Sequence, residues 1–278
     1  MHFCRHVPGP PLGEYVDWLW YYDDWQVDHS REHVLPDGSF QLIINLEQRR
    51  RKLFDREDPT KYQTFRRSWL SGAQSGYLII DVLCGASMIG AHFKPGGIAS
   101  FLGAPADELW DQVVELDGVW GASATELRER LLDGSGPRAK FRVLEQFLLK
   151  QLVKAQIGSQ TEKRVNLALK RFLEQPSVQK IGGVAGEFGV SHKHFIEEFR
   201  RRVGVTPKLF CRIRRFQQVL SQVNSNGSVE WAALALDCGY FDQCPFRQRL
   251  QAVRRFQSHL VFALSHALSK FRARGRLR

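Results

Sequence analysis

The chain has 278 residues, 43% of them hydrophobic, a length and composition that suit a soluble protein of two domains. It contains no stretch close to the roughly 18 uninterrupted apolar residues of a membrane span, and its start has no apolar segment typical of a secretory signal. The cysteines form neither a CxxC pair nor a metal-ligand spacing, so we expect reduced thiols in the cytoplasm: Cys4, Cys84, Cys211, Cys238 and Cys244.

The net charge of +11 is unevenly distributed along the chain. Residues 1–158 hold 18 Lys/Arg against 21 Asp/Glu, whereas residues 159–278 hold 22 against 8. A nearly neutral half joined to a strongly basic half is typical of a protein in which one domain binds a polyanion such as nucleic acid. A basic surface that only keeps the protein in solution is the alternative.

The first half alternates short apolar runs with turn signals. A turn cluster at 34–39 precedes an apolar run at 40–46, which predicts a strand. Residues 48–59 are rich in charge and predict a loop. Further strands are predicted at 77–83 and 88–93.

Helical patterns follow the strands. Pro95-Gly96-Gly97 interrupts the chain before a short helix predicted at 98–102. Residues 122–156 have helical periodicity with a break at 134–137, and their apolar stripe comprises Leu127, Leu131, Leu144, Phe147, Leu148 and Leu152. We therefore predict an α+β, two-domain protein whose residues 1–157 form a β-rich sensory or dimerisation domain.

The remaining chain predicts helices only. One helix ends before Pro176, and a short one spans 181–188. Gly189-Val190 forms a turn, and Ser191 is a good N-cap for a third helix because its hydroxyl can accept a hydrogen bond from a free backbone N–H. Gly204 ends that helix, and Thr206-Pro207 begins a long one.

A short helix, a glycine-containing turn and a capped helix form the pattern of a helix-turn-helix, in which the first turn of the second helix faces base edges in the major groove. The alternative is an ordinary helical hairpin whose charged residues face water. A similar unit follows at 229–243, and Phe246 and Leu250 repeat the spacing of Phe195 and Phe199 51 residues later. Two such units joined by a long helix could reach successive major-groove turns about 34 Å apart.

Several stretches resemble the AraC/XylS family of helix-turn-helix transcription regulators. SHKHFIEEFRRRVGVTPKLFCRIRRFQQVL resembles the first half of its DNA-binding domain, and ALALDCGYFDQ the start of the second half. VLPDGSFQLIINL and GAHFKPGGIASFLGAPADELWDQVVELDGVWG are similar to the β-rich domain of one subgroup. The resemblance implies double-stranded DNA as a partner, with a small-molecule effector and a homodimer as further expectations. It implies no cofactor.

The resemblance and the helix pattern together predict the DNA contacts. His192, Lys193 and His194 would read bases, and Arg200 with neighbouring basic residues would hold phosphate. Asp242 and Gln243 begin the second reading helix. The predicted DNA-binding residues are Ser191, His192, Lys193, His194, Glu197, Arg200, Arg201, Asp242 and Gln243.

After Gln243 the resemblance ends. The family would continue with a small residue, His-Phe, a basic amphipathic helix and a Gly-x-x-Pro-Thr-type ending, whereas residues 244–278 contain basic residues and no acidic one. Permitted codons for residues 244–263, read one nucleotide out of frame, give AHFVNDFRRFGGFNPTWSL, which restores that ending. We therefore hypothesise a one-nucleotide frameshift near codon 244, so the DNA-binding domain of 158–263 is altered after 243 and 264–278 form a basic tail.

Other functions have weaker signals. Asp81, Cys84 and His92 lie near one another in the sequence, but no nucleophile motif frames them, so we predict no enzyme. Metal binding by a pocket lined by histidines is a minor alternative, which would use His6, His29, His33 and His92. The many tryptophans of the first half suggest core packing or an apolar effector pocket. The main competing function is a remnant ligand-binding or dimerisation module with impaired DNA binding.

Overall fold

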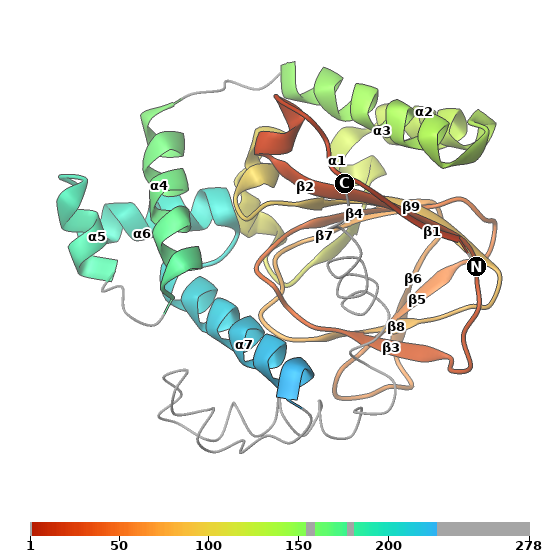
Figure 1. The fold of residues 1–278 in the computed structure, drawn as a ribbon, viewed down its shortest axis with the longest axis horizontal. Helices are drawn as coiled ribbons and strands as arrows, with labels where there is room; N and C mark the ends of the chain where they lie inside the picture. Colours follow the sequence, from red (N-terminus) through yellow and green to blue (C-terminus); the bar gives the residue numbers. More distant parts are fainter. Residues whose placement is uncertain (1, 154–158, 177–180, 227–278) are drawn as a thin grey trace.

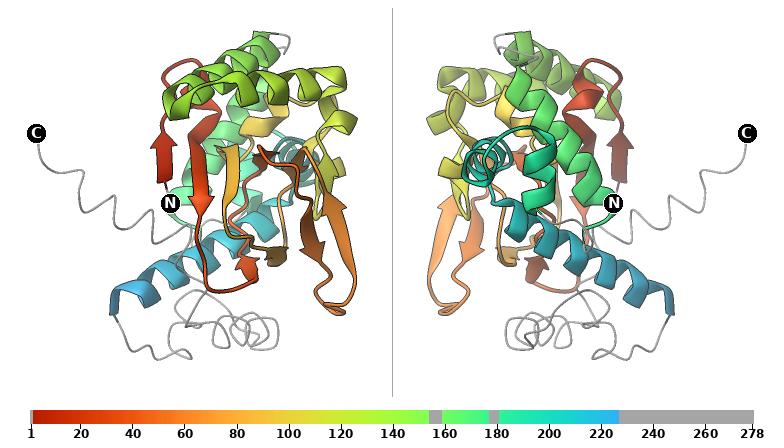
Figure 2. Two further views of the ribbon diagram at one scale, coloured as in Figure 1. Left: turned by 90° about the vertical axis from the view of Figure 1, so that its right-hand side faces the viewer. Right: turned by 90° about the vertical axis from the view of Figure 1, so that its left-hand side faces the viewer.

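The computed structural model describes residues 2–153, 159–176 and 181–226. Two antiparallel sheets face each other, helices cover the outer side of one sheet, and a group of helices lies beside them (Figure 1). Figure 2 shows the same arrangement from two further sides. We refer to residues 2–153 as the sheet region and to residues 159–226 as the helical region. The prediction of a β-rich first half followed by helices is confirmed.

The larger sheet has six strands in the order β1-β2-β9-β4-β7-β10, and each pair of neighbours is antiparallel. These strands are β1 (His2–His6), β2 (Val16–Trp25), β9 (Ala86–Phe93), β4 (Gln41–Asn45), β7 (Ser68–Ser71) and β10 (Val113–Glu115). The smaller sheet has the order β3-β8-β5-β6. Its strands are β3 (Arg31–Val34), β8 (Leu78–Asp81), β5 (Arg51–Phe54) and β6 (Tyr62–Phe65).

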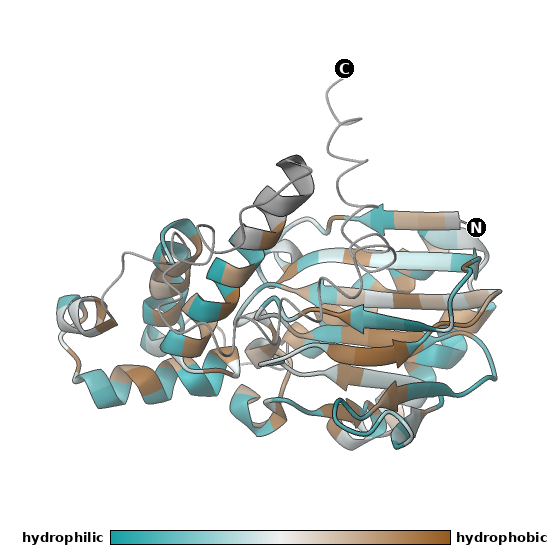
Figure 3. Ribbon diagram, turned by 90° about the horizontal axis from the view of Figure 1, so that it is seen from below, coloured by the Kyte–Doolittle hydropathy of each residue, from teal (hydrophilic) through white to brown (hydrophobic). Residues whose placement is uncertain are grey.

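Side chains alternate between the two faces of the larger sheet because successive residues of a strand point in opposite directions. Leu42 and Ile44 of β4 are fully buried in the main hydrophobic core, on the face that packs against the helices. Ile43, between them, lines a cavity between the two sheets. Trp20 of β2 lines the same cavity and lies against β9, where a Cβ on Gly90 would lie 2.3 Å from its ring. Figure 3 shows the apolar residues concentrated in the central strands.

The sheet region contains short 3-10 helices as well as α-helices. The 3-10 helices are η1 (Leu12–Glu14), η2 (Gly97–Ser100) and η3 (Ala106–Leu109), and the α-helices are α1 (Asp117–Trp120), α2 (Ala122–Asp133) and α3 (Gly136–Val153). The predicted break between α2 and α3 is confirmed, and all residues of the predicted apolar stripe are buried.

The helical region contains α4 (Gln160–Glu174), α5 (Ile181–Glu187), α6 (His192–Val203) and α7 (Pro207–Asn226). The predicted end of α4, both ends of α5 and α6, and the predicted start of α7 agree with the structure to within one or two residues. One continuous hydrophobic core includes buried residues of both regions, from Leu42 in β4 to Phe199 in α6 and Phe210 in α7. The helical region is therefore packed against the sheet region.

Two predictions need correction. The charged stretch 48–59 is not only a loop, because Arg51–Phe54 form strand β5 in the middle of the smaller sheet. Its first and last residues are buried, so charge density misled the prediction. The predicted helix at 98–102 is the single 3-10 turn η2. The second predicted helix-turn-helix unit and the basic tail lie outside the described residues.

Candidate nucleic-acid interface

Helices α5 and α6 are joined by a short turn at Gly189. Gly189 has a φ of 66°, a left-handed conformation that glycine adopts at little steric expense. The N–H of Gly189 donates to the carbonyl oxygen of Gly186 at 3.0 Å, which closes the turn. The hydroxyl of Ser191 accepts a hydrogen bond from the N–H of His194 at 3.2 Å, as predicted for the N-cap.

Aromatic side chains pack α6 against the neighbouring helices α4 and α7. Phe195 and Phe199 of α6 are fully buried, together with Val184 and Ala185 of α5. The ring of Phe199 packs edge-on against Phe172 of α4 and Phe210 of α7, with centroids 5.8 Å apart in each pair. This packing fixes which face of α6 points outward.

A buried acid fixes the orientation of α6 relative to α4. Glu198 accepts hydrogen bonds from Arg164 at 2.6 Å and from Thr161 at 2.8 Å, and His194 lies 3.2 Å from the same carboxylate. Burial acts to raise the pKa of Glu198, but the hydrogen bonds from Arg164 and Thr161 outweigh it and lower the pKa. Glu198 is therefore an ionised structural anchor, which the sequence analysis did not single out.

The outer face of α6 carries most of the predicted DNA-binding residues. The exposed residues are Ser191, His192, Lys193, His194 and Glu197 on or beside its first turns, and Arg201 in its last turn. Arg200 is only partly exposed, because its guanidinium lies 3.1 Å from Asp107 in η3 and 3.1 Å from Glu197. Asp242 and Gln243 lie outside the described residues.

The C-terminal half of α6 is docked against the sheet region. Arg202 forms a buried ion pair with Glu162 of α4 and donates to the hydroxyl of Ser100 in η2 at 3.4 Å. Gly204 ends the helix with a φ of 88° and lies directly against the ring of Phe40. Sequence reasoning predicted Gly204 as the helix end but missed its close contact with Phe40, because periodicity within α6 does not show its distant neighbours.

A loop of the sheet region also contacts α7. Arg214 donates to the carbonyl oxygen of Asp37 at 3.2 Å, and Gln217 donates to that of Pro36 at 2.6 Å. The carboxylate of Asp37 lies 2.6 Å from Nε2 of His92. Burial acts to raise the pKa of Asp37, but His92, the N–H of Ser39 and Arg214 lower it overall.

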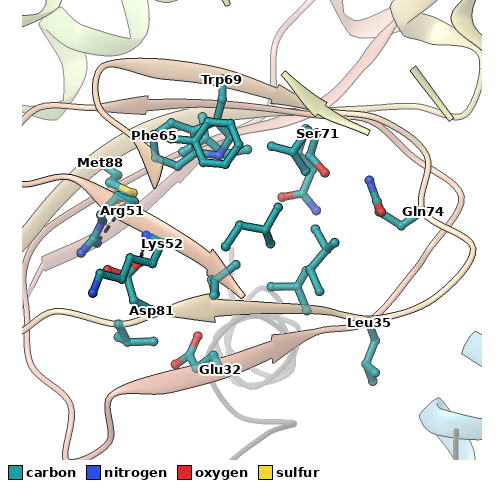
Figure 4. A pocket seen from close by; sticks show the side chains of 18 of the residues that line it. Glu32, Leu35, Arg51, Lys52, Phe65, Trp69, Ser71, Gln74, Asp81 and Met88 are labelled. Carbon is teal, nitrogen blue, oxygen red and sulfur yellow. Dashed lines mark hydrogen bonds between the residues drawn. The ribbon is translucent and has the colours of Figure 1, made fainter. Parts of the chain in front are cut away.

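The cavity between the two sheets has a volume of about 160 Å³. Its walls come from both sheets and are largely apolar, with aliphatic and aromatic side chains (Figure 4). The aromatic side chains that line it are Phe3, Trp20, Tyr22, Trp25, Phe65 and Trp69. Part of the 34–39 loop, which contacts α7, also lines this cavity. Three of the tryptophans thus serve as pocket walls, whereas Trp110 is half exposed.

The histidines of the minor metal alternative do not form one site. His6 pairs with Glu145, His29 with Asp28 and Glu32, and His92 with Asp37. Within the described part of the chain, no group of three His, Cys, Asp or Glu side chains could hold a metal ion. Among the same residues, no helix is both long enough and apolar enough to span a membrane.

Comparisons with known proteins give one family match and several structural ones. The family described as "Domain of unknown function (DUF6597)" matches residues 4–115, and no curated protein matches the chain. The apo form of a variant of ToxT from Vibrio cholerae is 14% identical, with 84% of this chain and 92% of that chain covered and a TM-score of 0.40. Wild-type ToxT with an unsaturated fatty acid bound is 11% identical, with coverages of 90% and 91% and a TM-score of 0.39.

Proposed function

We propose that this protein is a sequence-specific DNA-binding transcription regulator of the AraC type and not an enzyme. The observation that carries the proposal is the geometry of α5, the turn and α6. The first turn of α6 is capped by Ser191, its aromatic residues face inward, and Lys193 projects from the exposed face. That arrangement suits insertion of the first turns of α6 into a major groove.

The residues of α6 divide by the contacts they can make. His192, Lys193 and His194 lie at the end that would enter the groove, where side chains reach base edges. Arg201 is exposed further along the helix and suits a phosphate contact. Arg200 already pairs with Asp107, so we assign it a phosphate contact only in a form of the protein in which that ion pair opens.

We also propose that residues 158–263 form the DNA-binding domain, that a second reading helix begins at Asp242 and Gln243, and that the reading frame changes near codon 244. The expected AraC-type ending in the displaced frame supports the frameshift. Resequencing of the gene tests it directly: a confirmed reading without a family-like displaced frame would reject the hypothesis. Action in the cytoplasm and as a homodimer, with 1–157 as the sensory or dimerisation domain, belongs to the same proposal.

A competing function is a ligand-binding or dimerisation module whose DNA binding is impaired. The cavity in the sheet region favours this possibility, because the residues described at its walls all come from the part of the chain before the helical region. The two functions differ in one measurable property, which is specific affinity for duplex DNA.

Fluorescence anisotropy with duplex DNA from the region upstream of the gene, at several salt concentrations, tests the proposal. Lys193→Ala should weaken specific binding about 5- to 100-fold if Lys193 contacts a base, and should reduce the salt dependence by about one ion if it contacts phosphate. Lys150→Ala, which removes the same charge from an exposed site on α3, is the matched control and should bind like the wild type. Equal, sequence-independent binding by all three proteins would favour the remnant module.

A further inference from the structure

Arg51 is a charged residue buried at the wall of the cavity between the two sheets. Only 5% of its surface is exposed, and its Nη1 has no hydrogen-bond partner. Its Nη2 lies 3.9 Å from the sulfur of Met88, a weak acceptor. Among the described residues Arg51 forms no ion pair. The charge of Asp81 acts on Arg51 without a contact ion pair, and a buried guanidinium that no carboxylate contacts is costly.

Charged side chains gather around Arg51 on one side of the cavity, where Lys52 and Asp81 also lie (Figure 4). The carboxylate of Asp81 is held by the backbone N–H of Lys52 at 2.8 Å, and burial raises the pKa of Asp81. Burial likewise raises the pKa of Tyr22, beside Arg51, to about 12, although Arg51 acts to lower it. The Nζ of Lys52 lies over the ring of Tyr62, 4.2 Å from its centroid. The guanidinium of Arg51 forms a hydrogen bond with Tyr22, and its buried Nη1 remains without a partner.

We propose that the cavity binds a small aromatic carboxylate, with Arg51 as the residue that receives the carboxylate. The guanidinium matches a carboxylate geometrically and can donate two parallel hydrogen bonds to it. Trp20, Trp25 and Trp69 provide ring faces and edges against which a planar aromatic body packs better than a saturated one. Asp81 opposes the ligand charge and thereby limits the affinity.

The cavity is connected to the helical region through a shared wall. Leu35, Pro36 and Asp37 line the cavity, and the carbonyl oxygens of Pro36 and Asp37 accept hydrogen bonds from α7. A ligand that displaces this loop would change how α7 is held. This coupling rests on the proposed function, whereas the binding site does not.

Isothermal titration calorimetry of the full chain with cinnamate, without DNA, tests the site. The neutral analogue cinnamyl alcohol should bind about tenfold more weakly or worse, because it cannot accept charge-assisted hydrogen bonds in the same way. Cyclohexylpropanoate, which keeps the carboxylate and loses the aromatic ring, should also bind more weakly. Failure of cinnamate to bind, or equal binding of cinnamate and its alcohol, would overturn the proposal, and tighter binding of cyclohexylpropanoate would overturn its aromatic part.

Removing the charge of Arg51 and removing that of Asp81 should change the affinity for cinnamate in opposite directions. Arg51→Met should lose about tenfold or more in cinnamate affinity and leave the affinity for cinnamyl alcohol unchanged, whereas Asp81→Asn should bind cinnamate more tightly. Arg50→Met, on an exposed neighbour, is the matched control. If Arg51→Met does not fold, Arg51→Lys keeps the charge but not the paired donors, and wild-type affinity in that variant would overturn the assignment of Arg51.

DNA anisotropy with and without cinnamate separates the two proposals. Cinnamate binding with no DNA binding under any condition would reject the regulator and leave the site standing. DNA binding by a protein that does not bind cinnamate would reject the site and leave the regulator standing.

Discussion

The two ends of α6 have opposite environments. At its N-terminal end Ser191, His192 and Lys193 are exposed, and the cap is a single hydrogen bond within the helix. At its C-terminal end Arg202 and Gly204 are packed against η2 and Phe40 of the sheet region. One helix therefore presents a free surface and a docked surface. Substitutions at the docked end should affect folding, whereas those at the free end should affect recognition.

Substitutions at the docked end of α6 should have the largest effect on the free energy of unfolding. Gly204→Ala places a Cβ 2.8 Å from the ring of Phe40 at a φ of 88°. The left-handed conformation costs about 1–2 kcal/mol for a residue with a Cβ, and overpacking adds about 1–3 kcal/mol. Urea unfolding should show a loss of about 2–5 kcal/mol. Gly186→Ala, on α5 where a Cβ meets open space, is the control. A loss below about 1 kcal/mol for Gly204→Ala would mean that α6 is not docked as described.

Loss of the ion pair between Arg202 and Glu162, near Gly204, should have the next largest effect on stability. Glu162→Ala leaves Arg202 with only 14% of its side chain exposed and no carboxylate. Breaking a buried pair by removing one partner costs about 3 kcal/mol at the lower end of its range, and the free energy of unfolding in urea measures the loss. Glu174→Ala, at the last residue of α4, is exposed and should change stability by less than about 0.5 kcal/mol. Equal stability of the two variants would contradict the buried pair.

Because the pKa of Asp37 is lowered in the folded protein, we expect the protein to lose stability in acid. The stabilisation that Asp37 provides is present above its unfolded pKa of 3.8 and is lost as the pH falls from there through the folded pKa. Asp37→Asn should flatten the dependence of unfolding free energy on pH below about pH 5 and reduce stability at pH 7 by about 1.5 kcal/mol. An unchanged acid slope would show that the Asp37–His92 pair does not contribute.

The sequence predicted features that depend on neighbouring residues and missed those that depend on distant ones. The ends of α6 were predictable because a serine cap and a glycine stop act locally. The role of Glu198 and the contact of Gly204 with Phe40 were not, because they depend on partners far away in the chain. In the sheet region the charged letters around Arg51 indicated a loop, yet the residue is buried in strand β5. Charged residues usually indicate an exposed loop, so a charge buried in a strand leads such a prediction to the wrong structure.

Substitutions at the free end of α6 should have the smallest effect on stability. They also distinguish the free end from the docked end most clearly. Ser191→Ala removes the hydroxyl that accepts the N–H of His194 and should cost about 1 kcal/mol. Ser191→Asp retains an acceptor and should restore most of that stability, although its charge should weaken binding to the polyanionic DNA. Stability and DNA affinity would then change in opposite directions at this end, in contrast to the docked end, where they should fall together. Parallel losses in Ser191→Asp would show that the first turn of α6 is held by contacts beyond its own cap.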